Sequence, residues 1–233
     1  MKLGNIYYIS KKINDLAGES VMNSMNIEQL RRNADILIID DEEFTYLDAM
    51  RKHKFSVEHK KDIESMNDLQ PYDIVLCDIR GVGKFLDSEF EGAYLISQAK
   101  KIYPNKQIIA YTASNFDPTY NSYTNVADAY ITKGTSIEDW ISLLDDRLKA
   151  CVDPIAQWNK LRTDFLETGM NTVDVAYIEQ LYVDAVKKGD FDAFENPEKL
   201  KVSLNRDARD VITKFMSSLS IKLIVKAITG GMA

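Results

Sequence analysis

The chain has 233 residues, of which 45% are hydrophobic and 28% charged, and its formal net charge is −7. This balance is typical of a folded globular protein and excludes a wholly disordered chain. The negative charge disfavours binding to nucleic acids and to anionic membranes. No apolar run approaches the roughly 18 residues of a membrane-spanning helix, and no apolar block follows Lys2. With Cys77 and Cys151 far apart and no disulfide framework expected, we predict a soluble cytoplasmic protein without a secretory signal.

Short apolar runs recur between residues 34 and 133, and they predict strands that are buried on both faces of a parallel sheet. The four clear runs are ADILIID at 34–40, YDIVLCD at 72–78, QIIAYT at 107–112 and ADAYITK at 127–133, and a weaker one is FSVEH at 55–59. Helical patterns separate these runs, and Ser136 with Asp139 resembles a capping box. Five strands that alternate with helices predict a doubly wound α/β sheet with right-handed crossovers.

The remainder of the chain is predicted to be helical. Three apolar helical patterns follow the sheet region, at residues 155–168, 173–188 and 205–229. Gly189 is expected to act as the C-cap of the second, and Asp153-Pro154 is the natural domain boundary. The sequence thus divides into a partly helical N-terminal extension at 1–33, a sheet domain at 34–150 and a helical module at 151–233.

Polar residues stand at the carboxyl ends of the predicted strands, which is the edge where open parallel sheets form their binding sites. They are Asp40 and Asp41 after the first strand, Asp78 after the third, Thr112 after the fourth and Lys133 after the fifth. Three carboxylates within a few ångströms repel one another, and either protonation or a metal must relieve that repulsion. A hard cation with oxygen ligands is the natural partner, which predicts Mg²⁺. Thr112 and Lys133 then offer a hydroxyl and a positive charge to a transferring phosphoryl group.

The order Asp-Asp, Asp, Thr, Lys on strands one, three, four and five resembles the receiver domains of response regulators in two-component signalling. The stretches that carry the resemblance are IIDDEEF, IVLCDIR, IIAYTAS and AYITKG, and the resembling region as a whole covers about half of the chain. Tyr130 stands where that family has its aromatic switch residue, and Glu91-Gly92 is similar to the start of the family's third helix. The resemblance implies a flavodoxin-like sheet with strand order 2-1-3-4-5.

The resemblance also implies a role for each residue. Asp78 would be the nucleophile that accepts a phosphoryl group from a histidine kinase or a phosphotransfer protein, and Lys133 would pair with the phosphate. Thr112 would move toward the phosphate and Tyr130 would follow it inward. The implied metal ligands are Asp40, Asp41, Asp78 and the backbone carbonyl of Arg80. The protein would then be a phosphoacceptor and not an enzyme that acts on another substrate.

The sequence departs from the family pattern near the acceptor. Val82 stands where the family has a proline, and Gly134 instead of proline follows Lys133. The loop at 79–91 is also longer than usual. These differences keep every chemical residue in place, but they leave open whether the loop permits stable phosphorylation.

The output of the helical module is predicted from its charge. Residues 151–233 carry 11 basic and 12 acidic residues, a net charge of −1, and no basic recognition helix, which disfavours DNA binding. We expect an interaction or dimerisation output that is switched by phosphorylation, with a downstream protein target that the sequence does not name. A homodimer and a monomeric three-helix unit both fit the apolar helix faces.

Two other interpretations remain. A degenerate receiver would bind protein partners without phosphate. A Mg²⁺-dependent hydrolase of the haloacid-dehalogenase type would place its nucleophile on the first strand and its acidic pair last, which is the reverse of the order found here. His53 and His59 are expected in solvent, since neither has a second ligand at metal-binding spacing.

Overall fold

The computed structural model describes residues 8–17, 26–86, 89–113 and 121–228, which belong to two compact units. One unit is Asn26–Leu148, and the other combines the described residues of the first 25 with those from Lys149 onward. No helix within the described ranges is both long enough and apolar enough to span a membrane.

The first unit, here called the sheet unit, contains five parallel strands in the order β2-β1-β3-β4-β5. The strands are β1 (Asp35–Ile39), β2 (Ser56–Lys60), β3 (Ile74–Asp78), β4 (Gln107–Thr112) and β5 (Ala129–Thr132). This order confirms the predicted flavodoxin-like sheet. β3 is buried throughout and β1 and β4 nearly so, as their continuous apolar runs predict, whereas the edge strands β2 and β5 are more exposed.

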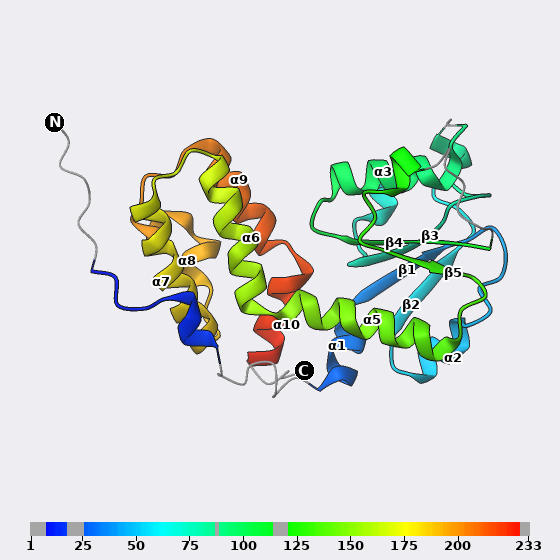
Figure 1. Cartoon of the computed structure of the whole chain (residues 1–233), viewed down its shortest axis with the longest axis horizontal. Helices are drawn as coiled ribbons and strands as arrows, with labels where there is room; N and C mark the ends of the chain where they lie inside the picture. The colour runs from blue at the N-terminus through cyan, green and yellow to red at the C-terminus, as the bar shows by residue number, and fades with distance from the viewer. Residues whose placement is uncertain (1–7, 18–25, 87–88, 114–120, 229–233) are drawn as a thin grey trace. The chain divides into compact units, whose positions relative to one another are not determined.

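Helices cover both faces of the sheet, with α3 on one face and α1 and α5 on the other (Figure 1). Their bounds are α1 (Ile27–Asn33), α2 (Leu47–Lys52), α3 (Glu91–Ile102), α4 (Asn121–Thr124) and α5 (Ile137–Val152), with 3-10 helices η2 (Met66–Leu69) and η3 (Lys84–Leu86). The Ser136 hydroxyl accepts a hydrogen bond from the Asp139 N–H at 3.2 Å and donates one to the Asp139 carboxylate at 2.9 Å. These bonds begin α5 where the sequence predicted it.

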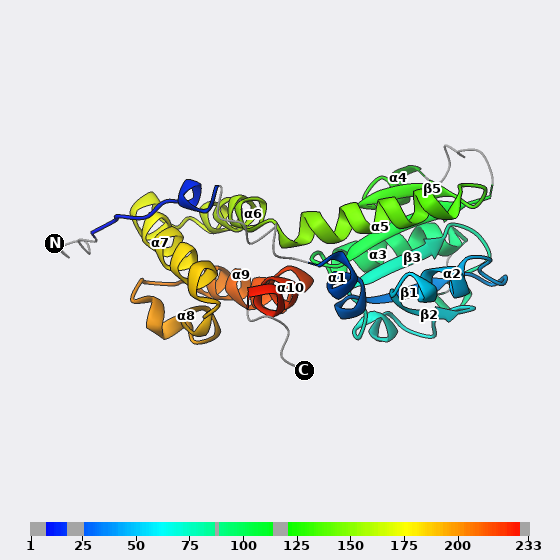
Figure 2. The same cartoon turned by 90° about the horizontal axis from the view of Figure 1, so that it is seen from below.

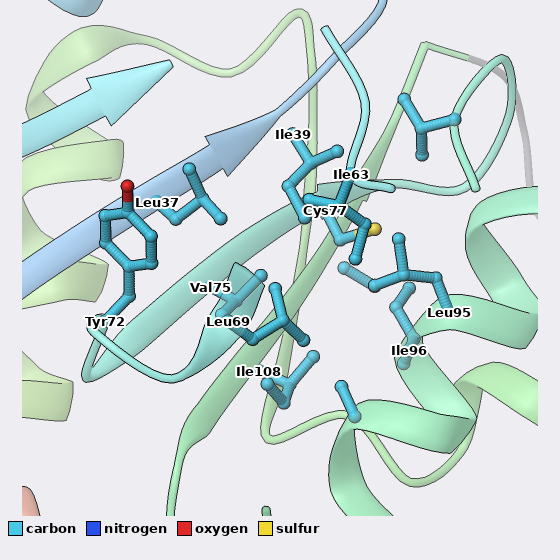
Figure 3. Packing of buried hydrophobic residues seen from close by; sticks show 13 residues of the cluster. Leu37, Ile39, Ile63, Leu69, Tyr72, Val75, Cys77, Leu95, Ile96 and Ile108 are labelled. Atoms are coloured by element: carbon cyan, nitrogen blue, oxygen red, sulfur yellow. The ribbon is translucent and has the colours of Figure 1, made fainter. Parts of the chain in front are cut away.

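A hydrophobic core lies between the sheet and α3 (Figure 3). Leu37, Val75 and Cys77 of the central strands and Leu95 and Ile96 of α3 are fully buried in it. Removing apolar surface of this kind from water contributes about 25 cal/mol per Å². The core therefore fixes the central strands against one another, and their carboxyl ends with them.

α3 begins directly against the end of β3. An ideal Cβ on Gly92 would lie 1.9 Å from the carbonyl oxygen of Asp78 and 2.9 Å from Cγ2 of Val82. Only glycine allows the helix backbone to approach β3 this closely. The start of α3 is thereby held beside the predicted phosphoacceptor.

The second unit, here called the helical unit, is built around buried aromatic rings. Its elements are η1 (Ile13–Leu16), α6 (Pro154–Glu167), α7 (Thr172–Lys188), α8 (Asp192–Glu195), η5 (Pro197–Leu200), α9 (Arg206–Met216) and α10 (Leu219–Ile228). Trp158 stacks on Tyr182 at a centroid distance of 5.3 Å, and Phe194 and Phe215 lie against the same tyrosine. Gly189 ends α7 with a φ of 67°, which confirms it as the C-cap.

The apolar pattern at 205–229 predicted one continuous stripe, and the structure divides it into α9 and α10. The Ser218 hydroxyl donates to the Phe215 carbonyl at 2.7 Å and accepts from the Ile221 N–H at 3.4 Å. Serine competes in this way with the backbone hydrogen bonds of a helix. Periodicity did not show the break because the apolar spacing continues across it.

The N-terminal residues 8–17 pack on α6 and α7 of the helical unit (Figure 2). The Ile13 N–H donates to Glu179 Oε1 at 2.8 Å, Lys11 pairs with Asp184, and Leu16 is buried. Glu179 Oε2 also accepts from the Trp158 indole at 3.0 Å. The sequence predicted a single extension at 1–33. In the structure, residues 8–17 of this segment belong to the helical unit and α1 belongs to the sheet unit.

The approach of α3 to β3 predicts an unusual response to alanine. Gly→Ala within a helix ordinarily stabilises, but Gly92→Ala would press a methyl group onto the Asp78 carbonyl and should destabilise the fold by about 1–3 kcal/mol. Gly134→Ala is the matched control, because its Cβ would meet nothing within 4 Å, and it should change stability by less than about 0.5 kcal/mol. Calorimetric unfolding of both variants measures the difference. Equal stability of the two variants would contradict this packing.

Candidate functional site

Three carboxylates meet at the carboxyl ends of β1 and β3. Oxygen atoms of Asp40, Asp41 and Asp78 all lie within 4.8 Å of one another. The register that pairs Ile39 of β1 with Cys77 of β3 sets the following residues side by side. Asp40 is 2% exposed and Asp78 5% exposed, whereas Asp41 faces solvent. The convergence that strand order predicted is therefore present in the structure.

Lys133 joins the two buried carboxylates. Its Nζ lies 2.6 Å from Asp78 Oδ2 and 3.0 Å from Asp40 Oδ2, with the exposed Glu42 carboxylate at 3.8 Å. The Lys133 backbone N–H donates to the carbonyl of Thr112 at 3.0 Å, which carries β5 past the end of β4. The ammonium is thus placed on the acidic cluster by the pairing of the last two strands.

The protonation of this cluster follows from burial and from these contacts. Burial raises the pKa of Asp78, although hydrogen bonds and charge from Lys133 and the Arg80 N–H at 3.3 Å act in the opposite direction. Burial lowers the pKa of Lys133, but its bonds to Asp78 and Asp40 outweigh that effect and raise it. One ammonium therefore compensates the buried pair only in part. An oxygen-only donor set of this charge fits a hard divalent cation such as Mg²⁺.

Thr112 is the last residue of β4, and Tyr130 lies within the neighbouring strand β5. Thr112 is half-buried at the end of β4 and is paired in register with Thr132 of β5. The Tyr130 side chain is 45% exposed, and its hydroxyl donates to the carbonyl of Thr124 in α4. The structure thus places the predicted switch residue in an outward position.

Tyr111 and His59 contact the cluster, and sequence reasoning missed both. The Tyr111 hydroxyl donates to Asp40 Oδ2 at 3.0 Å, and burial raises the pKa of this hydroxyl. The buried ring of Tyr111 packs against Phe44 and Trp140. His59 was expected in solvent, and this was wrong: the ring is half-buried, with Nε2 at 2.9 Å from the Asp40 carbonyl oxygen. The only available signal was that both residues lie near strand ends.

Two further carboxylates hold the backbone of the loop after β3. Asp62 accepts hydrogen bonds from the N–H groups of Gly83 at 2.7 Å and of Lys84 at 3.0 Å. Glu91, the first residue of α3, accepts one from the Gly81 N–H at 2.8 Å. The described part of this loop is therefore fixed by charge-assisted hydrogen bonds, although the family's proline is absent.

The same loop lies close against Asp41. Gly81 has a φ of 80°, and an ideal Cβ on it would lie 2.3 Å from Asp41 Oδ1. Lys84 places its ammonium 3.5 Å from Asp41 Oδ2, and Val82, at the position of the family's proline, is fully buried. The loop thus forms one wall of the acidic cluster.

Asp78 itself generates a stability prediction. Because its pKa is raised in the folded state, the folded protein binds this proton more tightly than the unfolded chain does. The stability supplied by the protonated carboxyl is present at low pH and is lost as the pH rises through the Asp78 pKa. Asp78→Asn should therefore gain stability relative to the wild type as the pH rises from about 4 to 7 in the absence of divalent cations.

Calorimetric unfolding in a chelator measures this difference, and each kcal/mol corresponds to roughly 2–4 °C in a chain of this size. A variant that is less stable than the wild type at neutral pH would show that the Lys133–Asp78 ion pair outweighs the burial of the charge.

Comparison with solved structures finds similarity to response regulators. A CheY-like receiver domain protein from Methanospirillum hungatei JF-1 is 23% identical, with a TM-score of 0.40 over 49% of this chain and 93% of that one. CheY4 from Vibrio cholerae is 17% identical, with a TM-score of 0.40 over 49% and 98%. A DNA-binding response regulator of the LuxR family from Staphylococcus aureus is 20% identical, with a TM-score of 0.41 over 50% and 98%. No family model and no curated protein matches the chain. The likeness concerns the fold of about half of the chain, which the strand order shows directly.

Proposed function

We propose that this protein is a cytoplasmic response regulator whose Asp78 accepts a phosphoryl group, with Mg²⁺, from a histidine kinase or a phosphotransfer protein. The observation that carries the proposal is the meeting of Asp40, Asp41 and Asp78 within 4.8 Å, with Lys133 at 2.6 Å from the proposed acceptor. Burial of two of the carboxylates supports a chemical role, because buried charges are otherwise unfavourable.

The donor set supports a magnesium site. The proposed ligands are carboxylate oxygens of Asp40, Asp41 and Asp78 and the backbone carbonyl of Arg80. When bound, the cation would supply positive charge for the phosphoryl oxygens. It would also favour the ionised form of Asp78, which burial disfavours in its absence.

The chain's own residues would then perform the transfer. The Asp78 carboxylate attacks the phosphorus of a phosphohistidine, a P–O bond forms, and the P–N bond to the imidazole breaks. In this structure Lys133 forms an ion pair with the Asp78 carboxylate. After the transfer, Lys133 would pair with the phosphoryl oxygens instead. Transfers of this kind depend mainly on positioning and electrostatics, and few groups are needed. The protein acts in this proposal as a phosphoacceptor and not as an enzyme on another substrate.

Phosphorylation would be communicated through Thr112 and Tyr130. The Thr112 hydroxyl would move toward the phosphoryl group, and Tyr130 would turn inward after it. That movement requires the Tyr130 hydroxyl to leave the Thr124 carbonyl, to which it is now bonded. The inward movement of Tyr130 would reshape the surface that β4, β5 and α5 form.

The helical unit would carry the output through protein contacts. Among the described helices α9 has the most basic residues, and its Arg206 and Arg209 are each followed in sequence by an acidic residue, Asp207 and Asp210. A surface of mixed charge suits contact with another protein or a second copy of this chain better than contact with DNA phosphates.

The acceptor is tested by intact-mass spectrometry after incubation with acetyl phosphate. We expect the wild type to gain the mass of one phosphoryl group only when Mg²⁺ is present, and Asp78→Asn to gain none. Asp48→Asn, which changes an exposed aspartate of α2, is the matched control and should be labelled like the wild type.

A degenerate receiver that binds partners without phosphate is distinguished in the same experiment. Beryllofluoride mimics a phosphoryl group on a carboxylate, so its binding with Mg²⁺ would keep the acceptor proposal even if the adduct is short-lived. If neither a phosphoryl group nor beryllofluoride binds, the acceptor proposal is wrong.

The output is tested with fluorescently labelled duplex DNA of random sequence. Because the chain carries a net charge of −7, we expect no change in anisotropy at micromolar protein and low salt, with or without prior phosphorylation. Binding that weakens as salt increases would reveal a basic surface and would contradict the proposed protein-contact output.

A further inference from the structure

We propose that Glu91 is a positioning residue of the proposed magnesium site: it holds the Arg80–Gly81 peptide in the orientation in which the Arg80 carbonyl would serve as a ligand. This inference rests on the proposed function, because the Arg80 carbonyl is one of the proposed ligands. It assigns to Glu91 a role in metal affinity that the strand-end residues do not supply.

The contact that carries the inference is a charge-assisted hydrogen bond. Glu91 Oε2 accepts from the Gly81 N–H at 2.8 Å. This N–H and the Arg80 carbonyl belong to one planar trans peptide, so they point in opposite directions. A carboxylate fixed on the N–H side therefore turns the carbonyl to the other side. The Arg80 N–H is bonded in turn to Asp78 Oδ1 at 3.3 Å, so Arg80 is held on both sides.

The held peptide lies at the acidic cluster. Gly81, which shares the peptide, is so close to Asp41 that an ideal Cβ would lie 2.3 Å from Asp41 Oδ1. A small rotation of this peptide would therefore change which backbone atom stands beside the carboxylates. The hydrogen bond from the Gly81 N–H to Glu91 opposes such a rotation.

The backbone of Glu91 is itself fixed. Its φ is 48°, in the left-handed region that residues with a Cβ rarely adopt. Gly92 packs against the Asp78 carbonyl, and an ideal Cβ on Gly83 would lie 2.9 Å from the Glu91 carbonyl oxygen. Close packing on both sides keeps the Glu91 carboxylate at a set position relative to Asp78.

Glu91 acts in this proposal through the peptide and not as a ligand. Among the described residues, the carboxylates that lie within 4.8 Å of one another are those of Asp40, Asp41 and Asp78, and Glu91 is not among them. The half-buried Glu91 carboxylate is instead directed to the Gly81 N–H. Residues that orient metal ligands in this way commonly change metal affinity when they are replaced.

The test is a calorimetric titration of Mg²⁺ into the full chain, without phosphoryl donor. Glu91→Ala removes the hydrogen bond and should weaken Mg²⁺ binding by about tenfold to a hundredfold. Glu91→Gln removes the charge but keeps an oxygen that accepts from the Gly81 N–H, so its affinity should stay close to that of the wild type. Glu89→Ala removes one exposed carboxylate from the same loop and should also bind like the wild type.

The outcomes separate this inference from the proposed function. A wild type that binds no Mg²⁺ overturns both. A wild type that binds, together with an unchanged Glu91→Ala, overturns the inference alone. Glu91→Gln as weak as Glu91→Ala would show that Glu91 acts by charge or as a ligand, and an equally weak Glu89→Ala would show a general charge effect of the loop. If Glu91→Ala fails to fold, Glu91→Met takes its place, because it keeps most of the side-chain volume but has only a weakly accepting thioether for the Gly81 N–H; an affinity equal to that of the wild type would overturn the inference, and a loss of about tenfold or more would support it.

Discussion

The ion pair of Lys133 with Asp78 and Asp40 is the interaction on which the end of the sheet depends. Two carboxylates that are almost fully buried cannot stay ionised side by side unless a positive charge lies between them. The side chain that supplies this charge directly follows the last strand, so the site is complete only when β5 has joined β4. The pairing of β1 with β3 brings the carboxylates together, and the pairing of β5 with β4 adds the charge that compensates them.

The other contacts around the acidic cluster hold backbone and side chains in place and do not compensate its charge. Asp62 and Glu91 bind N–H groups of the loop after β3, and Tyr111 connects Asp40 to a buried aromatic group. Hydrogen bonds that backbone N–H groups donate to a carboxylate can replace the restriction that a proline would give, because both remove rotational freedom from the chain. In its described part the loop at 79–91 is thus held by hydrogen bonds to carboxylates, whereas the family that the sequence resembles has a proline there.

Much of the sheet and of the acidic cluster could be predicted because both follow from local patterns. Buried parallel strands are continuous apolar runs in the sequence, and their carboxyl ends share one edge of the sheet. Asp78 and Lys133 could therefore be placed together from the sequence alone. Contacts such as those of His59 and Glu91 could not, since they depend on register and on backbone angles that periodicity does not encode. The serine that separates α9 from α10 was hidden for the same reason.

The N-terminal segment has a consequence for the order in which the protein is made. Residues 8–17 belong to a unit whose other members begin at Lys149, so the whole sheet unit is inserted between them. During synthesis the sheet unit emerges complete and can fold first, whereas Leu16 and Lys11 stay without their partners until α7 leaves the ribosome. A folded sheet unit shortens the effective loop that must close, which lowers the entropy lost when the two ends of the helical unit meet.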